Sequence, residues 1–177
     1  SGHLMARASA TLQPVRHIFM DQDDKIQKAI FGYAYSLLAR KRYTVAELQK
    51  KVTRKFPEQI KGIEETLQRL KEHHYLDDME YAGLFIESKL KRHPQSIKLL
   101  KWNLRKKGLD SDTIERSLNE ENINEAEMAR LAAQKKQKSL ARLPMAKQKE
   151  KLYRFLLSRG FSSSVIFQVV NKENGDL

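Results

Sequence analysis

The chain has 177 residues, 32% of them charged, and a formal net charge of +12 at pH 7. It contains no cysteine, which excludes disulfides, cysteine-ligated zinc and thiol catalysis. Seven glycines and four prolines are few for a sheet protein, so we predict an all-α fold. No apolar run reaches the roughly 18 residues of a membrane span, and we expect a cytoplasmic protein without membrane contact.

The first predicted helix follows a segment, residues 1–24, that we expect to be loose. Ser1–Met5 within it resembles a cloning scar before the natural start. Start and stop signals together with apolar periodicity predict nine helices. Their expected ranges are about 25–41, 44–56, 58–73, 78–92, 95–107, 111–121, 125–139, 145–159 and 162–171. We expect the tail, 172–177, to be loose as well.

Particular residues mark where these helices begin and end. Thr44 opens a capping-box pattern, in which a hydroxyl accepts from an amide that the helix leaves unpaired. Asp77 and Asn124 are helix starts of the same spacing. Gly108 and Gly160 fall where a helix should end in a left-handed residue.

The same apolar columns recur in three segments of the chain. One column holds Leu48, Leu100 and Leu152, and the next holds Val52, Leu104 and Leu156. The period is roughly 50 residues, which is typical of tandem units that bury a core by stacking. We therefore predict three tandem three-helix repeats, similar to helix-turn-helix units, at 25–76, 77–123 and 124–171.

Positive charge alternates with the repeats. Residues 89–107 hold eight cations and no anion, and residues 130–159 hold ten cations against Glu150 alone. Between them, residues 110–127 hold seven carboxylates and one cation. Such segregation indicates a polyanionic partner, either nucleic acid or an acidic protein surface.

The middle helix of each repeat supplies the candidate binding residues, because side chains between its core columns must face outward. They are Lys50, Arg54, Lys98, Lys101, Trp102, Arg105, Lys106, Lys107, Lys151, Arg154 and Arg159. These helices offer few Asn or Gln side chains to recognise base edges. The pattern thus favours contact with a nucleic-acid backbone over sequence recognition.

Trp102 shares its repeat column with Lys50 and Arg154, which predicts that the column is exposed. An exposed tryptophan among lysines could stack on an unpaired base. Alternatively, Leu99 and Trp102 form a second apolar stripe that packs against a neighbouring repeat. The sequence leaves both interpretations open.

The sequence offers no catalytic constellation. The histidines lack the spacing of a metal site, and no glycine-rich phosphate loop is present. Asp77 and Asp78 could be paired carboxylates, but their place before a helix favours capping. We expect no enzyme activity, no metal or other cofactor, and no small-molecule substrate.

Two groups of residues resemble the RecX family of bacterial recombination regulators. One runs from His74-Tyr75-Leu76-Asp77-Asp78 through Tyr81-Ala82 to Phe85-Ile86, and the other is Phe155-Leu156-Leu157-Ser158-Arg159-Gly160-Phe161. The similarity spans about residues 26–171. The chain departs from the family at Lys91–Pro94, where the family has a glycine-containing loop.

The resemblance implies an extended, curved array of modules that binds the RecA recombinase and its filament on single-stranded DNA. It also implies inhibition of ATP hydrolysis, strand exchange and coprotease activity, with restraint of the SOS response. Double-stranded DNA is a further candidate partner. Two alternatives stay open: a helix-turn-helix type protein that binds duplex DNA without a recombinase, and a helical adaptor for an acidic protein.

Overall fold

A computed structural model describes residues 25–172, and these residues form helices without any strand. The helices are α2 (Lys25–Leu38), α3 (Val45–Lys55), α4 (Ile60–Glu72), α5 (Asp78–Arg92), α6 (Ile97–Lys106), α7 (Ser111–Glu120), α8 (Glu125–Leu140), α9 (Met145–Ser158) and α10 (Ser163–Lys172). They confirm the predicted helices, although α2 ends three residues early. The segment predicted to be loose at 1–24 lies outside the described residues, as does the tail apart from Lys172.

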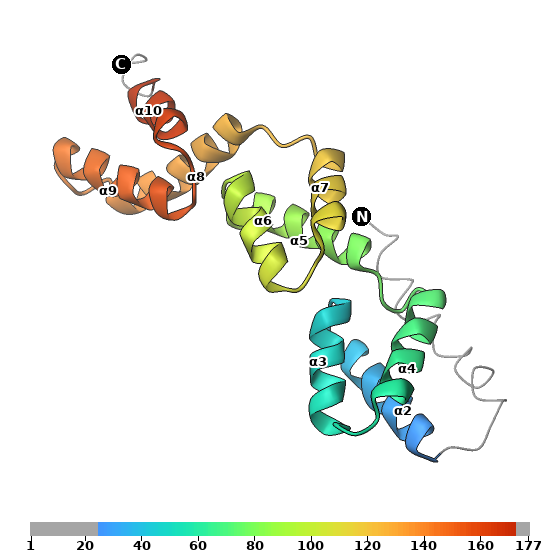
Figure 1. Ribbon diagram of the computed structural model, residues 1–177. Helices are drawn as coiled ribbons and strands as arrows, with labels where there is room; N and C mark the ends of the chain where they lie inside the picture. Colours follow the sequence, from blue (N-terminus) through green and yellow to red (C-terminus); the bar gives the residue numbers. More distant parts are fainter. Residues whose placement is uncertain (1–24, 173–177) are drawn as a thin grey trace, which may run out of the picture.

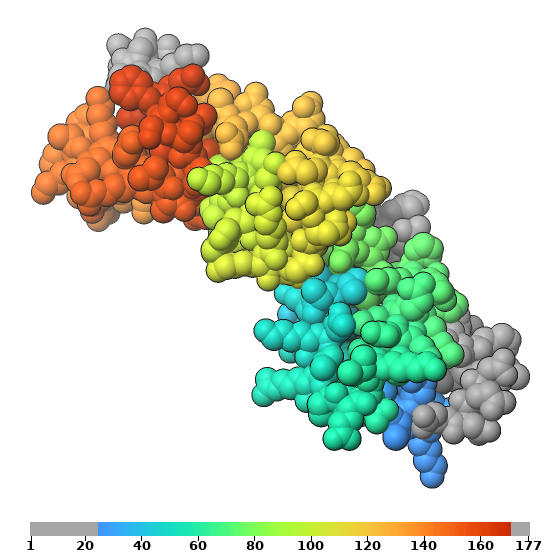
Figure 2. Space-filling view, viewed as in Figure 1, coloured from blue at the N-terminus to red at the C-terminus, as the bar shows by residue number. Residues whose placement is uncertain are grey.

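The helices form three units that follow one another in a curved row (Figure 1). Repeat 1 is α2–α4, repeat 2 is α5–α7 and repeat 3 is α8–α10. The middle helices α3, α6 and α9 lie along the inner side of the curve, which Figure 2 shows as the hollowed side of the molecule. The predicted array of three-helix repeats is confirmed.

Each repeat has its own small hydrophobic cluster. The predicted columns are the centre of these clusters, since Leu48, Leu100 and Leu156 are fully buried and Leu152 is nearly so. Burying one such side chain contributes roughly 1.5–3 kcal/mol. Because no single core spans the array, the position of one repeat on the next depends on the contacts at their junctions.

The junction of repeats 1 and 2 is built on the start of α3. The Thr44 hydroxyl donates to the carbonyl oxygen of Lys107 at 2.6 Å and accepts from the amide of Glu47 at 3.1 Å. The amide of Val45 donates to Oδ1 of Asp78, 2.9 Å away. Asp78 is the first residue of α5, so repeat 2 supplies part of the cap of a helix in repeat 1.

The junction of repeats 2 and 3 repeats this arrangement at the start of α6. The amide of Ile97 donates to Oε1 of Glu125 at 2.9 Å, and Glu125 is the first residue of α8. The amide of Ser96 donates to the carbonyl oxygen of Arg159 at 3.0 Å. The same places in consecutive repeats therefore make equivalent contacts.

A glycine permits the close approach at each junction. Gly108 and Gly160 both have φ +83°, a left-handed conformation that other residues adopt with strain. A Cβ atom at Gly108 would overlap the Cβ of Ala46, and one at Gly160 would lie 2.5 Å from the Ser96 hydroxyl. The predicted left-handed helix ends are confirmed, and they also serve as docking points.

Replacing Gly108 with Ala should lower the free energy of unfolding by at least about 1–2 kcal/mol, through backbone strain and overlap with Ala46. Gly83→Ala is the matched control, because Gly83 lies within α5 and has open space around its Cβ position. It should be neutral or stabilising by up to about 1 kcal/mol. Urea denaturation measures both. Equal effects of the two substitutions would contradict the junction described here.

Asp78 makes stability depend on pH. Burial raises the pKa of its carboxyl group, and the hydrogen bond from Val45 opposes that shift only in part. The folded protein thus binds this proton more tightly than the unfolded chain, so the contribution of Asp78 to stability falls as pH rises above the ordinary value of 3.8.

Asp78→Asn removes this titration but keeps an oxygen acceptor for Val45. Relative to the variant, the unmodified protein should lose stability as the pH is raised from about 4 to about 7, measured by urea denaturation. If the free energies of unfolding of the variant and the unmodified protein differ by the same amount at every pH, the proposed role of Asp78 is wrong.

Candidate nucleic-acid interface

The predicted binding residues lie on the three middle helices and at their C-terminal ends. We call this set the basic face. Eight of its side chains are exposed, namely Lys50, Arg54, Lys98, Trp102, Arg105, Lys106, Lys151 and Arg154, and three are partly buried, namely Lys101, Lys107 and Arg159. The three helices that carry the set lie on the inner side of the array (Figure 1).

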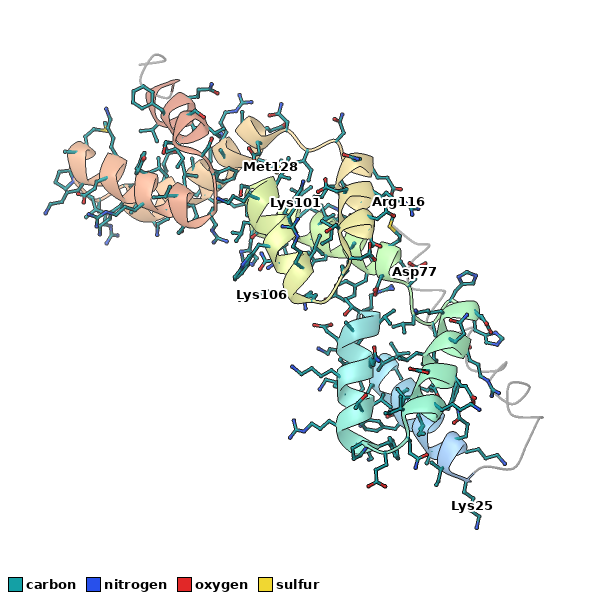
Figure 3. The ribbon with its side chains drawn as sticks, in the orientation of Figure 1. Lys25, Asp77, Lys101, Lys106, Arg116 and Met128 are labelled. Carbon is teal, nitrogen blue, oxygen red and sulfur yellow. The ribbon has the colours of Figure 1, made fainter. Side chains whose placement is uncertain are left out.

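Three members of the basic face already have carboxylate partners. Lys101 pairs with Glu115 of α7 at 2.6 Å, and Arg154 pairs with Glu150 one turn away at 2.7 Å. Figure 3 shows Lys101 on the side of α6 toward α7, and Lys106 near the C-terminal end of α6. The Arg154 pair is exposed, and such pairs are worth about 0–1 kcal/mol, so a polyanion could displace it at little cost.

Lys107 is different, because it belongs to the junction of repeats 1 and 2. Its ammonium lies 2.8 Å from Glu47 and 5.6 Å from the ring centroid of Tyr81. Burial lowers the pKa of Lys107, but the interactions with Glu47 and Tyr81 outweigh it and the net shift is upward. Its place in the binding set stays a prediction, while its contacts are structural.

Repeat 1 carries a groove of about 540 Å³ between α2 and α3 in which cations gather around two tyrosines. The ammonium of Lys55 lies 4.4 Å from the ring centroid of Tyr33, and that of Lys41 lies 4.4 Å from the ring centroid of Tyr43. These cation–π contacts hold the ammonium groups at the groove without neutralising them. Neither tyrosine nor Lys41 lies on a middle helix, which is why the repeat columns did not indicate them.

Trp102 is 50% exposed, and the ammonium of Lys106 lies 3.7 Å from its ring centroid. The predicted exposure of its column is confirmed. Trp102 lines a hollow of about 610 Å³ together with Leu157, also 50% exposed, and Phe161. Leu99 borders the same hollow but is less exposed, and its Cβ lies 3.0 Å from where a Cβ of Gly160 would lie. The apolar alternative therefore holds for Leu99, while part of Trp102 stays open to solvent.

The carboxylates considered for catalysis have structural roles. Asp77 caps α5 by accepting from the amides of Met79 at 2.8 Å and Glu80 at 3.0 Å. Within residues 25–172, no three His, Asp or Glu side chains come together in a way that could hold a metal ion. None of the described helices has both the length and the apolar character needed to cross a membrane.

Family models and relatives agree with this architecture. Residues 77–118 match the second three-helix domain of RecX, and residues 124–170 match the third. The regulatory protein RecX of Chlorobaculum tepidum is 31% identical over 154 residues, covering 87% of this chain and 94% of that relative. RecX of Clostridium botulinum strain Eklund 17B is 39% identical over 114 residues, covering 63% of this chain, which spans only about half (53%) of that relative's length.

A solved structure supports the fold. The crystal structure of RecX from Lactobacillus salivarius superimposes with a TM-score of 0.68 and 22% identity, covering 82% of this chain and 95% of that chain. At this identity the likeness concerns the arrangement of helices alone. The sequence matches and the shared three-helix domains together show that the chain belongs to the RecX family of regulatory proteins.

Proposed function

We propose that this protein is a negative regulator of the RecA recombinase, acting in the cytoplasm on RecA and on its filament with single-stranded DNA. The observation that carries the proposal is the recurrence of cationic middle helices on one side of a curved array of the RecX family. The expected effects are inhibition of ATP hydrolysis, strand exchange and coprotease activity. Recombinational repair and the SOS response would be restrained in consequence.

The positive charge of the basic face favours binding of a polyanion whose charges recur along its length, such as a nucleic-acid strand. Each repeat contributes exposed cations on its middle helix, for example Lys50, Lys106 and Lys151. Backbone phosphates recur along a strand, so an array of cationic helices can contact several of them whatever the base sequence. Family membership favours regulation over catalysis, and the proposal needs neither a cofactor nor a small-molecule substrate.

Duplex binding without a recombinase remains the second candidate. It is favoured by the likeness of the repeats to helix-turn-helix units, in which one helix lies against DNA. The two candidates differ in outcome, since the second predicts equal duplex binding with or without filament and no effect on the recombinase. An adaptor for an acidic protein predicts no binding of nucleic acid at all.

The rate of ATP hydrolysis by RecA on single-stranded DNA should fall when the protein is added at well below one molecule per RecA subunit. Charge reversal at Arg105 and Lys106 should weaken this inhibition, because both side chains are exposed on α6 and have no carboxylate partner among the described residues. Lys107 is unsuitable for this test, since its reversal would also break the junction.

The matched control is charge reversal at Lys28 and Lys61, exposed residues of α2 and α4. It changes the net charge equally and should leave inhibition unaltered. The double variant at Arg105 and Lys106 should also flatten the salt dependence of single-strand binding, by about 0.7 log units for each phosphate that the variant no longer neutralises. Absence of inhibition by the unmodified protein at any ratio would reject the proposed function.

Trp102 offers a direct signal, because it is the one tryptophan of the chain. If a base stacks on it, a single-stranded oligonucleotide should quench its fluorescence, and Trp102→Ala should weaken binding by about 5- to 100-fold. Phe167→Ala removes an aromatic ring that is 67% exposed on α10, which is not one of the middle helices, and should not change the affinity. Unchanged emission at saturating oligonucleotide would rule out stacking.

A further inference from the structure

A second cationic hollow lies where repeats 2 and 3 meet, outside most of the basic face. It has a volume of about 250 Å³ and is bordered by the end of α5 and by α8 and α9. The side chains that matter are Arg92, His93, Lys135, Lys136, Phe155 and Arg159, and no carboxylate is among the lining residues. Of these, only Arg159 was predicted from the sequence.

Neutral groups, and not carboxylates, hold the cations of this hollow. The ammonium of Lys135 donates to the carbonyl oxygen of Lys91 at 2.7 Å, at the C-terminal end of α5. The Arg159 guanidinium lies 5.0 Å from the ring centroid of Phe155, and the ammonium of Lys136 lies 5.6 Å from the same centroid. Among the described residues, no carboxylate comes within 4.0 Å of these cations or of Arg92.

The hollow therefore concentrates uncompensated positive charge in a partly enclosed space. Like charges repel one another there, and a bound anion would relieve that repulsion. Two guanidinium and two ammonium groups together suit a phosphate, which offers several acceptor oxygens at once. The small volume fits one phosphate group and not a folded acidic surface.

The neighbouring residues favour the phosphate of a nucleic-acid strand. Arg159 lines this hollow, and the next residues, Gly160 and Phe161, line the hollow that contains Trp102, which Lys98 and Glu125 also border. An anion site and an aromatic surface thus border the same end of α9. That pairing matches a nucleotide unit, which joins a phosphate to a flat base, better than it matches an acidic peptide.

We propose that the hollow between Arg92, Lys135, Lys136 and Arg159 binds a backbone phosphate of a single-stranded nucleic acid at the junction of repeats 2 and 3. The proposal rests on the nucleic-acid binding proposed above and names a site for it. It adds Arg92, Lys135 and Lys136 to the residues that contact the strand.

The test is the binding of a fluorescently labelled oligothymidylate to the whole chain, without recombinase, at several salt concentrations. The variant is Arg92→Gln with Lys136→Gln, which leaves the Lys135 contact with α5 in place. Its affinity at low salt should fall by about tenfold or more, and its salt dependence should be shallower by about 0.7 log units for each phosphate that it no longer binds. Thermal unfolding should be unchanged.

Lys28→Gln with Lys61→Gln is the control of equal charge. If both double variants bind with the same affinity and salt slope, the proposed site is wrong. If the Arg92 and Lys136 variant loses only the binding of pyrophosphate, the hollow serves a free anion, and the proposal is equally wrong. RecA inhibition is measured separately, so a protein that inhibits RecA without binding the oligonucleotide would overturn this site and leave the proposed function standing.

Discussion

The close backbone approach at the two repeat junctions is the constraint on which the rest of the structure depends. Each repeat is a small unit with its own core, and the glycine that ends its middle helix lets that end dock on the start of the previous middle helix. The end repeats lack one half of this arrangement. Helix α3 is followed by Phe56, with φ −129°, and not by a left-handed glycine, and α9 begins after Pro144 without a side-chain cap. The contacts therefore link the three described repeats through the starts of α3 and α6.

These junctions determine how the cationic segments of the sequence are arranged relative to one another in the folded protein. Equivalent docking at both junctions places α3, α6 and α9, which carry exposed lysines and arginines, on the same side of the curve (Figure 1). Separate basic helices would each bind a polyanion weakly, because exposed charges are screened in salt. Held in one array, they can contact a strand at several phosphates simultaneously, which raises the affinity without any new kind of contact. The action proposed above depends on this arrangement of the three middle helices.

Local patterns predicted the helices, their core columns and the left-handed glycines, because caps and apolar periodicity act within a few residues. They did not indicate that Asp78 and Glu125 cap helices of the preceding repeat, since these hydrogen bonds join residues 33 and 28 positions apart. The role of Lys107 also depends on a contact between residues far apart in the sequence. Its sequence neighbours suggested a binding lysine, whereas its ion pair with Glu47 comes from another repeat. The cationic hollow at Arg92 and Lys136 could not be predicted from local sequence patterns either, because residues of three helices come together to form it.

Lysine footprinting of the protein bound to a RecA filament on single-stranded DNA tests the central claim most directly. Acetylation followed by mass spectrometry would compare the reactivity of each lysine in the free and bound protein. The account predicts that Lys50, Lys106 and Lys151, one from each repeat, are protected together, while Lys28 and Lys61 remain reactive. Protection of Lys28 and Lys61 with continued reactivity of the middle-helix lysines would contradict it, as would protection confined to a single repeat.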